Sequence, residues 1–215
     1  MPTAPSSLTA YLASAIAIST SETGTVAMFH SRVGSSEQNS AMYLLTPLHT
    51  APAIFGSGIL ENRTVFSDQA VSVNGITFDN AFGYVVAGKG ALNLVADTPG
   101  NPVVNVVQGS HEFQIRVNLQ ADAEVNVAAP SALLSFNNDL DLNGNTLTKT
   151  GAGTLFINNK LNLGTGGTID CQGGNCAGSG TIGGNLSNNS LVSPGNSPGI
   201  LSVCLLYTSP SPRDR

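Results

Sequence analysis

The chain has 215 residues, which is long enough for one or two domains with a buried core. Only 10% of the residues are charged, 41% are hydrophobic and 24 are glycine, which excludes a disordered polar chain and is typical of short stacked strands. The net charge of -5 and the 8 scattered basic residues argue against a nucleic-acid partner, because such a partner requires a clustered basic face.

The first 50 residues, 1–50, form a lead-in whose structure the sequence specifies poorly. The apolar stretch 8–18 fits either a short helix or an edge strand. It also resembles the centre of an export signal, but no Lys or Arg precedes Arg32, so the basic start of such a signal is missing. A chain that starts inside a longer gene explains this equally well. We expect residues 1–50 to be irregular or to cap the domain that follows.

From residue 51 the chain consists of short runs in which apolar and polar residues alternate. In the stretch FQIRVNL, for example, Phe113, Ile115 and Val117 occupy every second position. Gly, Asn or Pro-Gly separate the runs, as expected of strands joined by tight turns. No helical periodicity is present, and no run reaches the about 18 apolar residues of a membrane-spanning helix. The sequence therefore predicts an all-β domain over residues 51–203.

A repeated motif predicts how these strands are arranged. Residues 137–142 (NNDLDL) recur as residues 158–163 (NNKLNL), 21 residues later, and a shorter copy (NNSL) begins at residue 188. The interval to the third copy would match the first if the nine residues 171–179 (CQGGNCAGS) were looped out. A fixed offset of about 20 residues lies at the short end of the range for solenoid repeats.

We interpret the repeat as one coil of a parallel β-solenoid, in which neighbouring coils lie about 4.8 Å apart. Equivalent residues then stack, so asparagines at a corner pass side-chain hydrogen bonds between coils while leucines line the interior. The predicted corner positions are Asn137, Asn138, Asn158, Asn159, Asn188 and Asn189. The predicted interior column contains Leu140, Leu142, Leu155, Ile157, Leu161 and Leu163. Asn pairs are also common in turns, but turn preference alone does not explain their shared NNxL frame.

Few residues suggest chemistry. The stretch DLDLNGN, which begins at Asp139, matches half of a calcium loop, but the last ligand position is Thr150 instead of Glu. We expect Asp139 and Asp141 on a solvated strand face, with weak calcium binding as the alternative. His111 and Glu112 lack converging partners and are expected to be ordinary surface residues at the start of a strand. The sequence predicts no catalytic residue, no metal site and no cofactor.

Two cysteines, Cys171 and Cys176, flank the residues Gln-Gly-Gly-Asn. In an oxidising compartment they would form a disulfide, and two free thiols are the alternative. A zinc site would need two further ligands nearby, and the surrounding sequence offers none.

Three stretches resemble the autotransporter-associated β-strand repeat of bacterial secreted and surface proteins. They are LTKTGAGTL (147–155), GSGTIGGNLSNNSLVSPGNSPGIL (178–201) and VSVNGITFDNAFGYVVAGKGALNL (71–94). This resemblance implies a right-handed parallel β-helix that is exported or displayed on the surface of a Gram-negative-type bacterium, without a conserved catalytic apparatus. The chain departs from the family pattern at both ends, where it shows no export signal, translocating barrel, sorting signal or anchoring tail.

These observations lead us to expect an extracellular or cell-surface display module, a stalk or adhesive scaffold that is not an enzyme. A surface polysaccharide or another cell-surface protein would be its partner, and open solenoid ends would allow self-association. The alternative is a carbohydrate-active or carbohydrate-binding β-helix, which requires carboxylates of successive coils to converge in one groove.

The last twelve residues, 204–215 (CLLYTSPSPRDR), break the low-charge, Gly- and Asn-rich composition. They resemble one reading frame of a sequencing adapter, so we expect a non-native disordered tail and exclude Cys204 from the fold. A native disordered end rich in Pro and Ser is the alternative.

Overall fold

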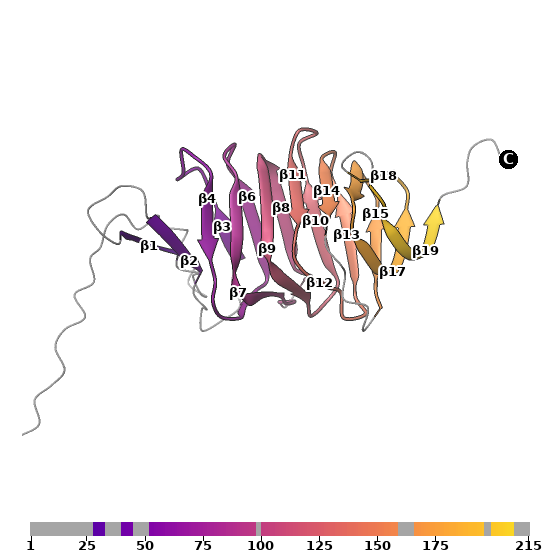
Figure 1. Cartoon of the computed structure of the whole chain (residues 1–215), viewed down its shortest axis with the longest axis horizontal. Helices are drawn as coiled ribbons and strands as arrows, with labels where there is room; N and C mark the ends of the chain where they lie inside the picture. The colour runs from indigo at the N-terminus through magenta and orange to yellow at the C-terminus, as the bar shows by residue number, and fades with distance from the viewer. Residues whose placement is uncertain are drawn as a thin grey trace, which may run out of the picture.

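The computed structural model describes the backbone of residues 28–32 and 40–44, and all of residues 52–97, 100–158, 166–195 and 199–208. These residues form strands, turns and connections, and none of them is in a helix. The strands build an elongated body with the N-terminal strands at one end and the C-terminal strands at the other (Figure 1). The chain is a parallel β-solenoid of about 7 turns, as the sequence predicts.

Two sheets run along this body and contain the core between them. The first sheet has 11 strands, which are β1 (Met28–Arg32), β2 (Ser40–Leu44), β4 (Arg63–Phe66), β5 (Val71–Val73), β7 (Tyr84–Leu94), β9 (Ser110–Leu119), β11 (Leu133–Phe136), β12 (Leu140–Asp141), β14 (Thr154–Ile157), β16 (Asn175–Gly178) and β18 (Leu191–Pro194). The second sheet has 8 strands, which are β3 (Pro52–Phe55), β6 (Gly75–Asp79), β8 (Val103–Gln108), β10 (Ala123–Val127), β13 (Thr146–Thr150), β15 (Thr168–Cys171), β17 (Thr181–Asn188) and β19 (Ser202–Thr208).

From β3 onward the chain alternates between the two sheets, so each turn crosses from the first sheet to the second and back again. Each new strand pairs in parallel with the equivalent strand of the previous turn, so Leu134 lies beside Leu155 and Leu155 beside Cys176. Only β1 and β2, among the described strands, pair antiparallel. Because every turn is hydrogen-bonded to the turns before and after it, side chains at equivalent positions stack along the body.

The long strands of the first sheet, β7 and β9, bend midway between their ends, and this bend shapes the outer surface (Figure 1). The strands β4 and β5 pair with the two halves of β7, and β11 and β12 pair with the two halves of β9. The pairing of β7 with β9 shifts register between Ala87 and Ala91. Gly88 lies in this segment with a φ of 135°, and a Cβ atom there would lie 2.1 Å from the carbonyl oxygen of Ser67. Glycine therefore allows the two coils to approach at the bend.

The core follows from the alternation in the sequence, because every second side chain of a strand points inward. All described members of the predicted interior column are buried, namely Leu140, Leu142, Leu155 and Ile157. Leu161, Leu163 and Asn159 lie outside the described residues. Near the N-terminal end, Phe55 stacks on Phe78 with ring centroids 4.7 Å apart, and further along, Phe113 stacks on Phe136 at 5.2 Å. The interior is thus a set of apolar columns.

The third copy of the Asn motif does not continue the column of the first two copies, contrary to the prediction. Asn188 pairs with Cys171 in the second sheet, and Asn189 follows it there. The column of Asn137 and Asn158 instead belongs to the end of the strands β11 and β14 in the first sheet. An Asn pair suits any tight corner, so its recurrence alone did not identify the same corner.

The block 171–179 is not looped out either. Cys171 ends β15, and residues Asn175–Gly178 form β16, which pairs with β14 and β18. Coil length varies instead, since β16 pairs Cys176 with Val192 whereas β14 pairs Leu155 with Cys176. Turns of unequal length are compatible with stacking as long as the paired strands keep their inward and outward alternation.

The described strands at both ends are paired with the solenoid. In the lead-in, β2 pairs with β4 and so extends the first sheet. At the other end, the prediction of a disordered tail is wrong for residues 204–208, which lie in β19 and pair with β17. Without β19, the edge of β17 would present unpaired N–H and C=O groups, and such an edge accepts a strand of almost any sequence. Residues 209–215 lie outside the described residues.

Candidate functional site

Side-chain hydrogen bonds connect successive coils on the outside of the solenoid. The Asn158 amide donates to the Asn137 side-chain carbonyl at 2.7 Å across a separation of 21 residues, which confirms the predicted stacking of this pair. Two further Asn pairs make the same contact, Asn126 with Asn105 at 3.0 Å and Asn118 with Asn93 at 2.9 Å. The sequence analysis missed these pairs, although recurrence of Asn at an interval of one coil was an available signal. The ladders stabilise the register between coils.

Asn138 has a different role from its neighbour Asn137. Its amide donates to the backbone carbonyl of Gln114 at 3.0 Å, and its side-chain carbonyl accepts from the Asp139 N–H at 2.7 Å. Asn138 thus stabilises the corner between β11 and β12 and does not stack on another described asparagine. This corner forms one border of a surface groove.

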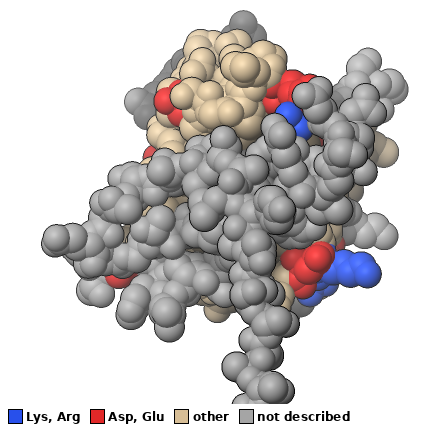
Figure 2. Space-filling view, turned by 90° about the vertical axis from the view of Figure 1, so that its left-hand side faces the viewer, with Lys and Arg blue, Asp and Glu red and all other residues tan. Residues whose placement is uncertain are grey.

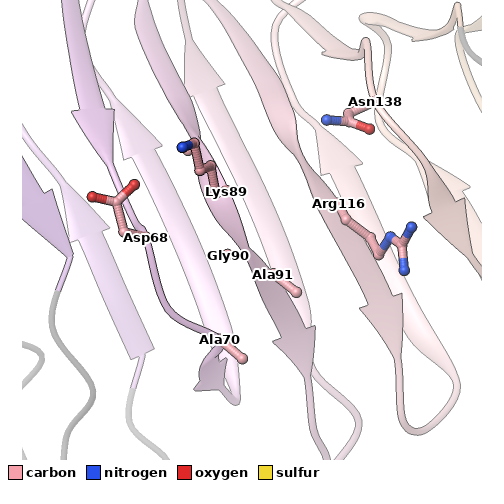
Figure 3. Close-up of a pocket in the computed structure, with 8 residues that line it drawn as sticks. Asp68, Ala70, Lys89, Gly90, Ala91, Arg116 and Asn138 are labelled. Atoms are coloured by element: carbon pink, nitrogen blue, oxygen red, sulfur yellow. The ribbon is translucent and has the colours of Figure 1, made fainter.

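The groove lies outside the bend of the first sheet and has a volume of about 680 Å³. Its floor consists of small residues on neighbouring coils, and polar side chains project around it (Figure 3). The lining residues are Asp68, Ala70, Gly88, Lys89, Gly90, Ala91, Arg116 and Asn138. They come from the β4–β5 connection, β7, β9 and the β11–β12 connection, so the groove extends across four successive coils.

Two of the three surface cations among the described residues line this groove. Of the described Lys and Arg side chains, Lys149 is buried and only Arg63, Lys89 and Arg116 reach the surface. Lys89 lies between Asp68 and Arg116 in the groove (Figure 3). Arg116 donates from Nη2 to Asp139 Oδ2 at 3.1 Å, and both side chains are solvent-accessible. In the view along the body from the N-terminal side, the visible basic atoms lie beside acidic ones (Figure 2).

His111 is buried, contrary to the prediction of a surface residue. Its ring stacks on Phe78 with centroids 4.5 Å apart, Nδ1 accepts from the Tyr84 N–H at 3.1 Å, and Nε2 lies 2.8 Å from the Gln108 carbonyl oxygen. Nδ1 acts as an acceptor, so the proton is on Nε2, and the ring is the neutral tautomer. Burial lowers the pKa of His111 below its ordinary value. His111 fills the interior column and does not face the groove.

Lys149 is a second buried titratable residue, which the sequence analysis missed. Its register partners are Val125 and Cys171, and its ammonium donates to the carbonyl oxygens of Thr150 at 2.6 Å, Gly151 at 3.0 Å and Gly173 at 3.0 Å. Burial lowers the pKa of Lys149 to about 8. The three carbonyls belong to two neighbouring turns, so Lys149 ties these turns together from inside. Its position in the alternating stretch LTKT was the available signal.

Cys171 and Cys176 form a disulfide, as one of the two readings of the sequence predicts. Both residues are buried, and Gly173, whose carbonyl accepts from Lys149, lies in the loop that they close. The bridge therefore sits at a corner of the core.

The acidic pair of the DLDLNGN stretch forms no metal cage. Asp139 pairs with Arg116, and Asp141 accepts from the Asn143 N–H at 3.0 Å in a local turn. Within the part of the chain that the structure describes, no cluster of three or more His, Cys, Asp or Glu side chains could hold a metal ion. No helix among the same residues is long and apolar enough to cross a membrane.

Comparison of the chain with protein-family models, with curated proteins and with solved structures gives no match.

Proposed function

We propose that the chain is a structural and display module of a bacterial secreted or cell-surface protein, a stalk or adhesive scaffold. The observation that carries this proposal is the uninterrupted stack of paired strands in both sheets. About seven turns at about 4.8 Å each give a body near 35 Å long, whose length depends only on the number of turns. Such a body holds whatever is attached to its ends at a set separation.

Two further features support this role. The Asn ladders and the apolar columns repeat the same contacts in successive coils, so the scaffold resists bending and register slips along its length. The Cys171–Cys176 disulfide is a feature of proteins that fold in oxidising compartments, which agrees with export. The resemblance to the autotransporter-associated repeat points to the same location.

Deletion of one coil in register tests the scaffold role. Leu134 is the register partner of Leu155, so removal of residues 134–154 places the second copy of the Asn–Leu motif where the first copy was. We expect a folded protein that is shorter by about 4.8 Å, measured as the distance between spin labels at the two ends. The matched control removes residues 134–153, which reverses inward and outward side chains after the junction and should not fold. An unchanged distance in the in-register variant would contradict the proposal.

Location is tested separately in a bacterium that expresses the full gene. An antibody against the purified chain should label intact cells or the culture medium. Labelling that requires cell lysis would contradict a secreted or surface role, whatever the outcome of the deletion.

The catalytic form of the carbohydrate alternative finds less support. Glycoside hydrolysis generally uses two carboxyl groups that face one substrate. Among the residues that line the groove, Asp68 is the one carboxylate. Asp139 is in contact with the lining residue Arg116 and forms an ion pair with it. We therefore develop the groove only as a binding surface.

A further inference from the structure

We propose that the groove over β7 and β9 binds a linear, uncharged polysaccharide. The proposal gives a ligand class to the adhesive role proposed above, but it depends on the groove alone and not on the length of the stack. It rests on the shape of the groove, on the side chains around it and on the pairing of the strands that form it.

The shape of the groove suits a chain-like ligand. Its volume is about 680 Å³. Its floor carries only small side chains or none, because it is formed by Ala70, Gly88, Gly90 and Ala91. A Cβ atom at Gly90 would lie 2.0 Å from the Gln69 carbonyl oxygen, so this position can carry only glycine without displacing the neighbouring coil. The lining residues belong to four successive coils, and an elongated ligand along the body would therefore meet side chains from each of them.

The polar side chains around the floor suit a ligand with many hydroxyl groups. Lys89 and Arg116 can donate hydrogen bonds and Asp68 can accept them. Asn138 uses one amide N–H and one lone pair of its carbonyl at the corner, which leaves it one further donor and one further acceptor. These donors and acceptors follow one another along the groove and are accessible to solvent (Figure 3). Hydroxyl groups both donate and accept, so neighbouring hydroxyls of a sugar can be satisfied by alternating side chains of this kind.

An extended peptide fits this groove poorly. Peptides usually bind sheets by adding a strand to an exposed edge, where backbone N–H and C=O groups are free. The strands that contribute lining residues are β7 and β9, and each of them has a hydrogen-bonded neighbour on both sides within the first sheet. The backbone of a bound peptide would therefore have no equivalent partners here.

The balance of charge favours an uncharged ligand over a polyanion. Arg116 is neutralised by Asp139, and Lys89 has Asp68 on its other side. A polyuronate or a nucleic acid would bring its charges close to these two carboxylates, and the whole chain carries a net charge of -5. An uncharged polysaccharide is repelled neither by the two carboxylates nor by the net negative charge of the chain.

Affinity electrophoresis tests the proposal with defined probes. The intact chain is run in native gels that contain dextran, laminarin, a galactomannan or polygalacturonate. We expect retardation by at least one of the three uncharged polysaccharides and none by polygalacturonate. Titration of the gel concentration then gives the dissociation constant.

Two variants locate the binding. Ala91→Phe fills the floor of the groove from a partly exposed strand position and should weaken binding at least tenfold. Ala128→Phe is the matched control, because Ala128 is exposed at the end of β10 and does not line the groove. Lys89→Met changes an exposed side chain without filling the floor, and it should weaken binding even if Ala91→Phe fails to fold.

The outcomes separate this proposal from the scaffold role. Binding that Ala91→Phe or Lys89→Met abolishes and Ala128→Phe preserves supports the groove as the site. Absence of retardation by every uncharged polysaccharide, retardation by polygalacturonate alone, or equal binding by all variants would overturn it. None of these results changes the length measured for the coil deletion, so either proposal can fail without the other.

Discussion

The side-chain amide of Asn158 lies one coil from Asn137 and donates a 2.7 Å hydrogen bond to its side-chain carbonyl. Both side chains are half-buried. Because neighbouring coils are also joined by the backbone pairing of β11 with β14, the ladder adds register specificity to a contact that already exists.

Asn137→Ala should lower the free energy of unfolding by about 1–3 kcal/mol, because the half-buried Asn158 amide loses its acceptor. The check is urea denaturation of both single variants and of the Asn137→Ala/Asn158→Ala variant. We expect the double variant to be more stable than the sum of the single effects predicts, with a coupling of about 1 kcal/mol. Strict additivity would show that the ladder contributes nothing. The Asn105–Asn126 pair offers an independent repetition of the experiment.

Stability should fall on acidification because of His111. Burial lowers the pKa of the folded imidazole below the value near 6.5 of an unfolded chain, so the unfolded state binds more protons as the pH falls below about 6.5. The contribution of the neutral His111 ring to the free energy of unfolding is therefore complete above about pH 6.5, and it is lost as the pH falls through the folded pKa. Protonation would also remove the acceptor at Nδ1 for the Tyr84 N–H.

The measurement is the free energy of unfolding of the wild type and of His111→Phe between pH 7.5 and pH 5, in about half-unit steps. Phenylalanine keeps the stack on Phe78 but does not titrate. The difference between the two proteins should depend on pH in this interval. Parallel curves would show that another group causes the acid sensitivity.

Lys149 should act in the alkaline range. Its pKa is lowered to about 8 in the folded state, so between about pH 8 and pH 10 the unfolded state binds more protons and the stability of the fold rises with pH. Lys149→Met should abolish this rise and, at pH 7, should still destabilise, because three buried carbonyl oxygens lose their donor. Burial raises the pKa of Tyr84, so above the unfolded value near 10 this residue makes stability fall as the pH rises. Thermal melts at about pH 7.5 to 9.5 avoid this opposing effect and therefore give the cleanest comparison. A wild type that loses stability over this range would contradict the assignment.

The disulfide should stabilise the fold by about 2 kcal/mol, as expected for closure of a short loop. The test compares thermal melts of the Cys204→Ser protein with and without reductant, since Cys204 is the free, exposed cysteine among the described residues. Cys171→Ala/Cys176→Ala should reproduce the reduced transition. Because both sulfurs are buried, reduction under native conditions should be slow and should follow the rate of unfolding. An unchanged melting temperature after reduction would remove the claim.

Local patterns determined much of this structure. Alternation in stretches such as FQIRVNL predicted the strands and the inward side chains, because a strand has a period of two wherever it lies. The offset between Asn137 and Asn158 predicted their stacking, and the column of Leu140, Leu142 and Leu155 is buried as expected. The close pair Cys171 and Cys176 also suggested the disulfide.

The remaining features depend on how coils of unequal length are placed over one another. Nothing local distinguishes the corner at Asn188 from the corner at Asn137, since both are Asn pairs in tight turns. The polar character of His111 and Lys149 suggests the surface, and only the stacked carbonyls and the Tyr84 N–H supply their partners.

The groove was likewise not visible in the sequence, because Asp68, Lys89 and Arg116 come from separate coils and meet only where the first sheet bends. Which residues alternate is a property of each strand by itself, and the sequence determined it. Which side chains become neighbours depends on the lengths of the connections between strands, and the assembled solenoid alone decided that.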